Sequence, residues 1–156
     1  MSLGTVSHLA FGVTDLDRSL TFYRDVLGMS VRDDRTHRTG ASAMHTAGRG
    51  KSERRVANLS WDGSDTFLVL SQFPDTTGAA IKLDQVGIHH VALWVQDVRG
   101  LYERLSAAGV TFVAEPVEFD AKGYGLAKGT VITCLLEDPD GIILQFDQHL
   151  QPGQLA

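Results

Sequence analysis

Apolar positions along the chain alternate between helical spacing and strand spacing. In residues 16–28, four apolar side chains share one helical face, at spacings of four, three and four: Leu16, Leu20, Tyr23 and Leu27. Residues 98–109 present a second such face: Val98, Leu101, Leu105 and Ala108. Each segment ends on a glycine, Gly28 or Gly109, which suits the left-handed position that follows many helices. The spacing therefore predicts two helices.

Three segments of strand length follow each predicted helix. Their apolar runs are bounded by turn residues, and they span 29–32, 56–61 and 66–73 in the first half and 111–114, 130–137 and 142–148 in the second. Two polar stretches, 33–55 and 115–129, are expected to form loops, the first with a short strand near 41–46. With its leading strand, each half reads β-α-β-β-β, which predicts an α+β fold.

The two halves also repeat each other in sequence. His8 aligns with His90, and Asp15 with Asp97, at one constant offset. Asp15 or its neighbour Thr14 is placed to cap the first helix. The expected organisation is a first module over 5–75, a linker over 76–86 and a second module over 87–150. Neither half is long enough to bury a good core alone, so we expect one compact domain, with a curled mixed sheet around a shared cleft.

Composition narrows the classes of function. With 43% hydrophobic and 21% charged residues among 156, the chain has enough apolar surface to fold. The net charge of -5 argues against a nucleic-acid partner, because phosphate binding needs a clustered positive field. No apolar run reaches the roughly 18 residues of a membrane span, and no signal-peptide pattern opens the chain. A single cysteine fits a reducing compartment, so a cytoplasmic location is expected.

Two histidines occupy equivalent places on the first strand of each half. Alternate strand residues face opposite sides, so one side can pack on the helix while His8 and His90 line the cleft. Two imidazoles brought together by the repeat make a divalent metal site plausible. Gln145 offers an amide oxygen as a third ligand, unless it makes a cross-strand hydrogen bond instead, and Asp147 is a reserve. His89 is expected to point to the other face.

The remaining reactive side chains receive mainly structural interpretations. Cys134 is expected to be a buried, inert thiol, since no base accompanies it. Tyr124 either closes over a ligand or lies on the surface. Surface positions are expected for the other histidines: His37, His45 and His149. A basic cluster either meets an anionic substrate or forms a solvated loop: Arg49, Lys51, Arg54 and Arg55. No nucleophile elbow, phosphate loop or dinucleotide motif is present, so no catalytic residue is assigned.

Two pairs of motifs resemble a known superfamily. Residues 6–17, which read VSHLAFGVTDLD, and 22–28, which read FYRDVLG, resemble the opening of the vicinal oxygen chelate superfamily. Residues 87–92 (GIHHVA) and 138–141 (DPDG) resemble its second module. That superfamily contains glyoxalase I, methylmalonyl-CoA epimerase, extradiol dioxygenases, and fosfomycin and bleomycin resistance proteins. The resemblance covers nearly the whole chain and implies two β-α-β-β-β modules.

The resemblance also implies where a metal would bind. In the superfamily, the ligands lie on the first and last strands of the modules, and these positions correspond here to His8, Val69, His90 and Gln145. Val69 departs from the glutamate or other polar ligand of glyoxalase- and epimerase-like members, which removes a base for proton transfer. The remaining set is closer to extradiol dioxygenases, although Gln145 stands at their carboxylate position and Leu135 at the position of a frequent tyrosine.

Two functions follow as expectations from the resemblance. The first is a metal-dependent enzyme that binds a small substrate through vicinal oxygens and is dioxygenase-like or lyase/isomerase-like. Its cofactor would be Fe, Mn, Zn or Ni, held by His8, His90 and Gln145. The second is a metal-free small-molecule binding or sequestering protein of the bleomycin-resistance type. A structural or regulatory role is a third possibility, and a homodimer is expected in each case.

Overall fold

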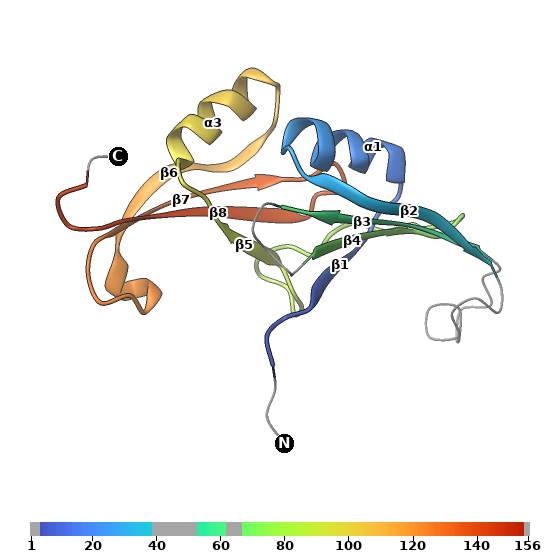
Figure 1. Cartoon of the computed structure of the whole chain (residues 1–156), viewed down its shortest axis with the longest axis horizontal. Helices are drawn as coiled ribbons and strands as arrows, with labels where there is room; N and C mark the ends of the chain where they lie inside the picture. Colours follow the sequence, from blue (N-terminus) through green and yellow to red (C-terminus); the bar gives the residue numbers. More distant parts are fainter. Residues whose placement is uncertain (1–3, 39–52, 62–66, 155–156) are drawn as a thin grey trace. The chain divides into compact units, whose positions relative to one another are not determined.

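The computed structural model describes residues 4–38, 53–61 and 67–154. The chain divides into two compact units, Met1–Gly78 and Ala79–Ala156, and each is described by itself. Each unit contains a four-stranded mixed sheet with a helical segment packed on it (Figure 1). The predicted α+β class, with two modules of curled sheet, is confirmed. The short strand expected near 41–46 lies outside the described residues.

The first unit follows the predicted β-α-β-β-β order. Its elements are β1 (His8–Gly12), α1 (Leu16–Leu20), the π-helical turn η1 (Thr21–Val26), β2 (Ser30–Arg38), β3 (Glu53–Ser60) and β4 (Phe67–Gln72). The strand order is β1-β4-β3-β2, and β1 runs parallel to β4 while the other pairs are antiparallel. The first and last strands of the unit therefore lie side by side.

The second unit repeats this arrangement. Its elements are β5 (His90–Trp94), α3 (Val98–Ala107), β6 (Phe112–Asp120), the 3-10 helix η2 (Ala121–Tyr124), β7 (Thr130–Glu137) and β8 (Ile143–Leu150). The strand order is β5-β8-β7-β6, with β5 parallel to β8. In the turn between β7 and β8, Asp138 Oδ1 accepts from the N–H groups of Asp140 and Ile142, at 2.9 and 2.8 Å. This turn fixes the hairpin that the Asp-Pro-Asp-Gly sequence predicts.

The two helices begin and end in matching ways. Asp15, rather than Thr14, caps α1: its Oδ1 accepts from the N–H three residues later at 3.0 Å, and Asp97 Oδ1 does the same for α3 at 2.9 Å. Gly28 and Gly109 follow with φ of 83° and 80°, which favour glycine, as the sequence predicts. Among the described residues, no helix is long and apolar enough to cross a membrane.

A glutamine from the last strand ties each helix to its sheet. Gln72 Oε1 accepts from the Leu16 N–H at 2.9 Å, and its Nε2 donates to the Thr14 carbonyl at 2.9 Å. In the second unit, Gln148 Oε1 accepts from the Val98 N–H at 3.0 Å. These bonds satisfy backbone groups that the first turn of a helix leaves free. Short sequence patterns do not indicate this contact, because it joins residues 56 and 50 positions apart.

The core of each unit lies between its helix and one face of its sheet (Figure 1). The largest fully buried side chains include Leu16, Tyr23, Leu59 and Leu70 in the first unit and Leu105, Ile132, Leu136 and Leu144 in the second. Because strand residues alternate between faces, the neighbours of these core residues occupy the face that carries no helix. This second face, called the open face below, carries the candidate site residues.

Two predicted loops are partly wrong. Strand β2 continues through residues 33–38 and pairs with β3 as far as Arg38 and Glu53, and β6 continues through residues 115–120. Both are edge strands whose outer residues are largely exposed, so charged side chains are compatible with strand structure there. Pro116 fits β6 because an edge strand with shifted register tolerates a missing N–H.

Candidate functional site

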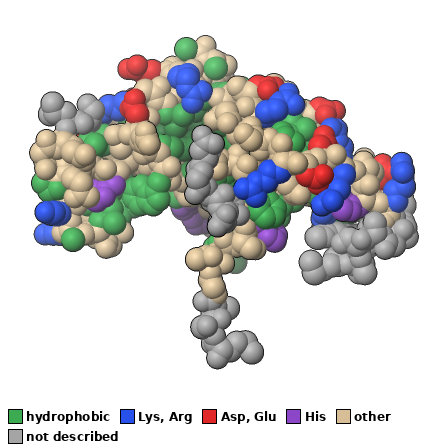
Figure 2. Space-filling view, viewed as in Figure 1, with side chains coloured by type: hydrophobic (Ala, Val, Ile, Leu, Met, Phe, Trp, Pro, Cys, Tyr) green, Lys and Arg blue, Asp and Glu red, His purple; other side chains and the backbone are tan. Residues whose placement is uncertain are grey.

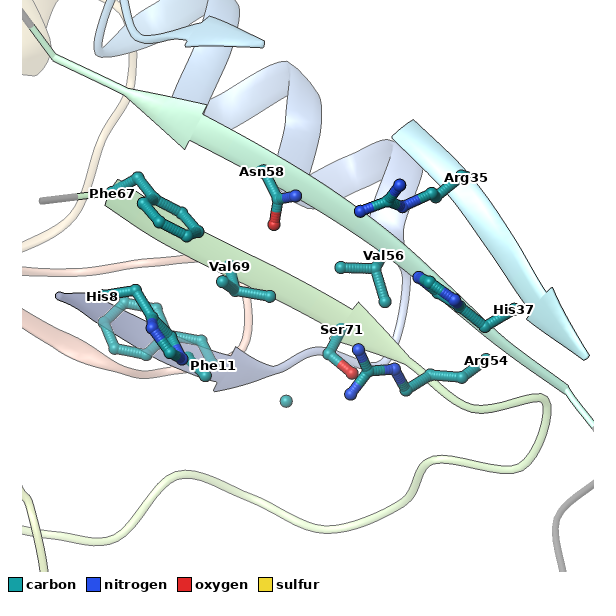
Figure 3. Close-up of a pocket in the computed structure, with 12 residues that line it drawn as sticks. His8, Phe11, Arg35, His37, Arg54, Val56, Asn58, Phe67, Val69 and Ser71 are labelled. Carbon is teal, nitrogen blue, oxygen red and sulfur yellow. The ribbon is translucent and has the colours of Figure 1, made fainter. Parts of the chain in front are cut away.

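The open face of the first unit is hollowed into a pocket. Its volume is about 390 Å³, and residues from all four strands line it (Figure 3). β1 contributes His8, β4 contributes Val69 and Ser71, and β3 contributes Asn58 and Arg54. The volume is in the range of small-molecule sites.

His8 lies at one end of this pocket. Its side chain is exposed, Nδ1 lies 3.0 Å from the Ser7 hydroxyl oxygen, and the ring stacks on Phe67 with centroids 5.3 Å apart. With Nδ1 beside Ser7, Nε2 is the nitrogen left to face a ligand. His8 therefore has the exposure and orientation that a ligand-binding imidazole needs.

Val69 occupies the neighbouring position on β4. Ala10 is its partner in the β1–β4 register, so Val69 lies beside the strand that carries His8. It lines the pocket and offers only methyl groups. The first unit thus provides one nitrogen donor and an apolar surface where the resemblance places a second ligand.

Arg54 and Arg55 face opposite sides of β3. Arg55 donates to Asp34 at 2.7 and 3.0 Å and to Asp17 at 2.8 Å, and these carboxylates raise the pKa of its guanidinium. Arg54 lines the pocket, and burial lowers the pKa of its guanidinium. Its Nε is buried and has no hydrogen-bond partner among the described residues. Such a donor costs about 1–3 kcal/mol. Arg55 therefore forms ion pairs within the first unit, whereas Arg54 is directed to the pocket.

The surrounding surface shows how the other charges are arranged. Arg35 lines the pocket and pairs with Asp33 at 2.8 Å, while Arg38 and Glu53 pair at 3.3 Å. Basic and acidic side chains alternate over this end of the unit (Figure 2). His37, predicted to lie on the surface, lines the pocket because β2 extends further than predicted. His45, Arg49 and Lys51 lie outside the described residues.

His90 and Gln145 share the open face of the second unit. Their strands are adjacent and parallel, and the register pairs His90 with Ile143 and Ala92 with Gln145. The two side chains therefore stand two positions apart on neighbouring strands. The structure brings these candidates to one face, whereas His8 belongs to the other unit.

The prediction for His89 is wrong. Its Nδ1 lies 2.6 Å from His90 Nδ1, and the two rings are 4.6 Å apart. Strand β5 begins at His90, so the alternation of faces does not extend back to His89. One of the two nitrogens must carry the proton in this contact, so Nε2 is the His90 ring nitrogen that lies outside the contact.

Gln145 is held by a buried carboxylate. Its Nε2 donates to both oxygens of Asp147, at 2.9 and 3.0 Å, and lies 3.4 Å from the Tyr124 hydroxyl oxygen. A carboxylate only accepts hydrogen bonds, so the amide nitrogen must face Asp147 and Oε1 must point away from it. Asp147 is only 3% exposed. It therefore orients Gln145, a role that the sequence did not indicate, and Tyr124 is drawn into the same network.

Cys134 is buried, as predicted. Burial and then the Asp147 charge raise the pKa of its thiol to about 11. The thiol is therefore uncharged at neutral pH and unsuited to nucleophilic attack.

The three candidate ligands, His8, His90 and Gln145, are of types that bind divalent metals, but all three are neutral. In the described part of the chain, no group of three or more His, Cys, Asp or Glu residues is arranged to hold a metal ion. His8, His90 and Gln145 would supply two imidazole nitrogens and one amide oxygen, which are suitable donors for Fe, Mn, Zn or Ni. They would bring no negative charge. These residues would therefore bind a divalent ion only weakly.

Comparisons with known proteins agree with this fold. The sequence model of the Glyoxalase/Bleomycin resistance protein/Dioxygenase superfamily matches residues 5–146. A probable lactoylglutathione lyase of Synechocystis sp. is 29% identical over 143 residues, which cover 90% of this chain and 92% of that protein.

Solved structures share the architecture at lower identity. A glyoxalase family protein from Bacillus cereus has a TM-score of 0.78 and 18% identity, over 96% of this chain and 97% of its own. TnmS3, an antibiotic binding protein from Streptomyces sp. CB03234, has a TM-score of 0.63 and 20% identity, over 96% and 99%. At these identities, the likeness concerns the fold alone.

Proposed function

This chain belongs to the Glyoxalase/Bleomycin resistance protein/Dioxygenase superfamily, and on that premise we propose that it is a metal-dependent enzyme of the glyoxalase/dioxygenase type for a small organic substrate. We propose that the substrate binds through two adjacent oxygens at a divalent metal held by His8, His90 and Gln145. The observation that carries the proposal is the Asp147 carboxylate, which turns the Gln145 amide so that its oxygen is available. Such outer contacts orient metal ligands in proteins.

The protein side chains would divide the work as follows. A divalent ion supplies Lewis-acid chemistry at substrate oxygens. His8 and His90 each present an outward Nε2, and Gln145 presents Oε1. Val69 takes no ligand position, which leaves room for both substrate oxygens. Asp147 keeps the Gln145 amide from rotating.

Val69 also bears on the type of reaction. A glyoxalase-type proton transfer needs a base near the substrate carbon, and a valine side chain accepts no proton. We therefore favour a dioxygenase-like reaction on catechols over hemithioacetal isomerisation. A lyase or isomerase reaction would require a base from elsewhere in the chain.

The proposed metal site is tested by measuring the metal content and the activity of the same protein preparation. Protein loaded anaerobically with Fe(II) or Mn(II) is expected to consume oxygen with a catechol and to lose metal readily to a chelator. A His8→Ala, His90→Ala double variant should lose both properties. Equal metal content in the wild type and the double variant would refute the site. Rapid thioester formation from methylglyoxal and glutathione, with Ni(II) or Zn(II), would refute the inference from Val69.

A second candidate is metal-free binding of a small molecule. The pocket in the first unit favours it, because Val69 and Phe67 give that pocket an apolar surface without requiring an ion. A relative in fold, TnmS3, is named as an antibiotic binding protein. Binding of an aromatic ligand by chelator-treated protein, with no turnover in either assay, would favour this function.

Assembly and location are also proposals. We infer a homodimer from the resemblance to the superfamily, and a cytoplasmic location from the single cysteine. Light scattering on the purified protein tests the dimer. A monomer across micromolar concentrations would contradict it.

A further inference from the structure

The pocket of the first unit has two chemically different ends. Arg54, Arg35 and His37 stand at one end, and His8 and Phe67 stand at the other (Figure 3). Val56 and Val69 lie between them. A ligand that fills this pocket would meet positive charge at the first end and a mainly apolar and aromatic surface toward the second, where Asn58 adds an amide and Arg32 lies over the Phe67 ring, 5.6 Å from its centroid.

Among the described residues, no carboxylate forms an ion pair with Arg54, which lines the pocket. Its Nε is buried without a hydrogen-bond partner in the described part of the chain, and burial lowers the pKa of the guanidinium. The adjacent Arg55 shows the usual arrangement, with Asp34 and Asp17 both within 3.0 Å. A guanidinium binds two oxygens in a fork geometry, which matches a carboxylate. The guanidinium of Arg54 is therefore suited to bind an anionic ligand.

The other polar groups of this end are consistent with an anion. The β2–β3 register places His37 opposite Arg54, and Arg35 opposite Val56, on the same face. Arg35 is already paired with Asp33, so it adds little free charge. No Asp or Glu is among the described residues that line the pocket, although the whole chain carries a net charge of -5. The lining itself therefore carries only basic charges among its described residues, and Asp33 beside it offsets the charge of Arg35.

The opposite end favours an apolar body. The His8 and Phe67 rings stack with centroids 5.3 Å apart, and Val69 offers methyl groups beside them. The volume of about 390 Å³ accommodates a ring-sized group with a short chain. A ring held at the His8 and Phe67 end would be separated from Arg54 by Val56 and Val69, which lie between the two ends on β3 and β4.

We propose that this pocket binds a small organic carboxylate, with Arg54 holding the carboxylate group and Val56, Val69 and Phe67 packing against an apolar body. No metal takes part in this contact. The proposal therefore stands or falls separately from the proposed metal site, and it names a ligand class for either candidate function.

The test uses the full chain after chelator treatment, with 3-phenylpropionate as the probe and neutral 3-phenylpropanamide as its matched partner. Titration calorimetry is expected to show the acid binding at least about tenfold more tightly than the amide, because a charge-assisted fork is lost in the amide. Arg54→Gln should remove that preference, and Arg54→Lys should keep part of it. Arg24→Gln removes the same charge from η1, which is not among the elements that line the pocket, and should change nothing.

Each other outcome would overturn the proposal. These are no binding of the acid to wild type, equal binding of acid and amide, or an equal loss in Arg24→Gln. Thermal melting of each variant separates lost recognition from lost folding. Inorganic phosphate that displaces the probe more strongly than acetate would assign the site to phosphate esters instead of carboxylates. Unchanged metal binding in the His8→Ala, His90→Ala variant, with the acid preference of the wild type intact, would refute only the metal site.

Discussion

The two units differ far more on their open faces than on their helix faces. On the helix side, each unit has an aspartate cap, Asp15 or Asp97, and a strand glutamine bound to the first turn, Gln72 or Gln148. These contacts satisfy backbone groups that any helix in this place would leave free. The repeated residues are therefore the ones that hold a helix onto a sheet.

On the open side, equivalent positions carry different chemistry. The strand registers make Val69 equivalent to Gln145, and Ser71 equivalent to Asp147. In the second unit, the glutamine and the aspartate bind each other. The first unit has an apolar side chain at the position of the glutamine, and its Arg54 Nε has no hydrogen-bond partner among the described residues. The helix faces therefore carry the contacts that both units share, and the open faces carry different chemistry in each unit.

Gln145→Glu tests the open face of the second unit and should have the largest effect. It adds a carboxylate next to Asp147, so we expect a lower melting temperature without metal. We also expect at least about tenfold tighter binding of Zn(II) or Mn(II), which corresponds to about 1.4 kcal/mol, because a carboxylate ligand brings the negative charge that an amide lacks. Metal titration followed by calorimetry measures both. Gln96→Glu, which adds the same charge at an exposed position, is the control. Unchanged metal affinity would contradict the proposed ligand role.

Cys134 tests a position that is Ala57 in the first unit, since Phe146 and Leu70 are their respective partners. Its pKa rises from 9.0 to about 11 on folding, so the folded protein holds a proton that the unfolded chain releases. Stability should therefore fall between pH 9 and 11, by about 2 kcal/mol. Urea unfolding across this range should show a flatter curve for Cys134→Ala. Parallel curves would show that the thiol does not titrate in this way.

The two glutamine contacts test the helix faces against each other. Gln72→Ala removes two hydrogen bonds, to Leu16 and Thr14, and should cost about 2 kcal/mol. Gln148→Ala removes the bond to Val98 and should cost about 1 kcal/mol. The difference in unfolding free energy, from urea titration, is the quantity of interest. Equal losses would mean that the Gln72 bond to Thr14 contributes little.

Arg54→Met gives the smallest predicted change, and its sign is informative. It removes a buried N–H group that has no hydrogen-bond partner in the described part of the chain. Stability should therefore stay unchanged or rise by about 1 kcal/mol, while recognition of 3-phenylpropionate is lost. Arg55→Met, on the other face, breaks ion pairs with Asp34 and Asp17 and should lower stability instead. Thermal melting compares the two. A clear loss of stability in Arg54→Met would indicate a structural role.

Much of the fold was predictable because the repeat and the apolar spacing act locally. The helix faces, the glycine stops and strand β7 at Thr130–Glu137 follow directly from short sequence patterns. The extents of β2 and β6 were not predictable in this way. An edge strand exposes much of its surface, so its polar residues look like those of a loop.

The candidate site also has residues that local sequence patterns indicate and residues that they do not. His8, His90 and Gln145 stand out in the sequence through the repeat, and their metal role stays a prediction. Arg54 and Arg55 are indistinguishable as neighbours in a basic cluster, and only the register of β3 decides which one faces the pocket. Extending the predicted strand 56–61 back by two residues would have placed Arg54 on the side of Val56. The bond between Gln145 and Asp147 depends on side-chain rotamers, which spacing alone does not specify.

The parallel pairing of β1 with β4 also sets an order for folding during synthesis. β1 is made first, but its partner ends at Gln72, so the ribosome must release nearly the whole unit before the sheet can close. Until then, β1 has no partner strand, while α1 and the β2–β3 pair can form from residues that are closer in sequence. The second unit imposes the same wait on β5, whose partner β8 is the last strand of the chain. Each nascent unit thus passes through a stage in which β1 or β5 has no partner strand, when premature release or a neighbouring chain offers the greatest chance of mispairing.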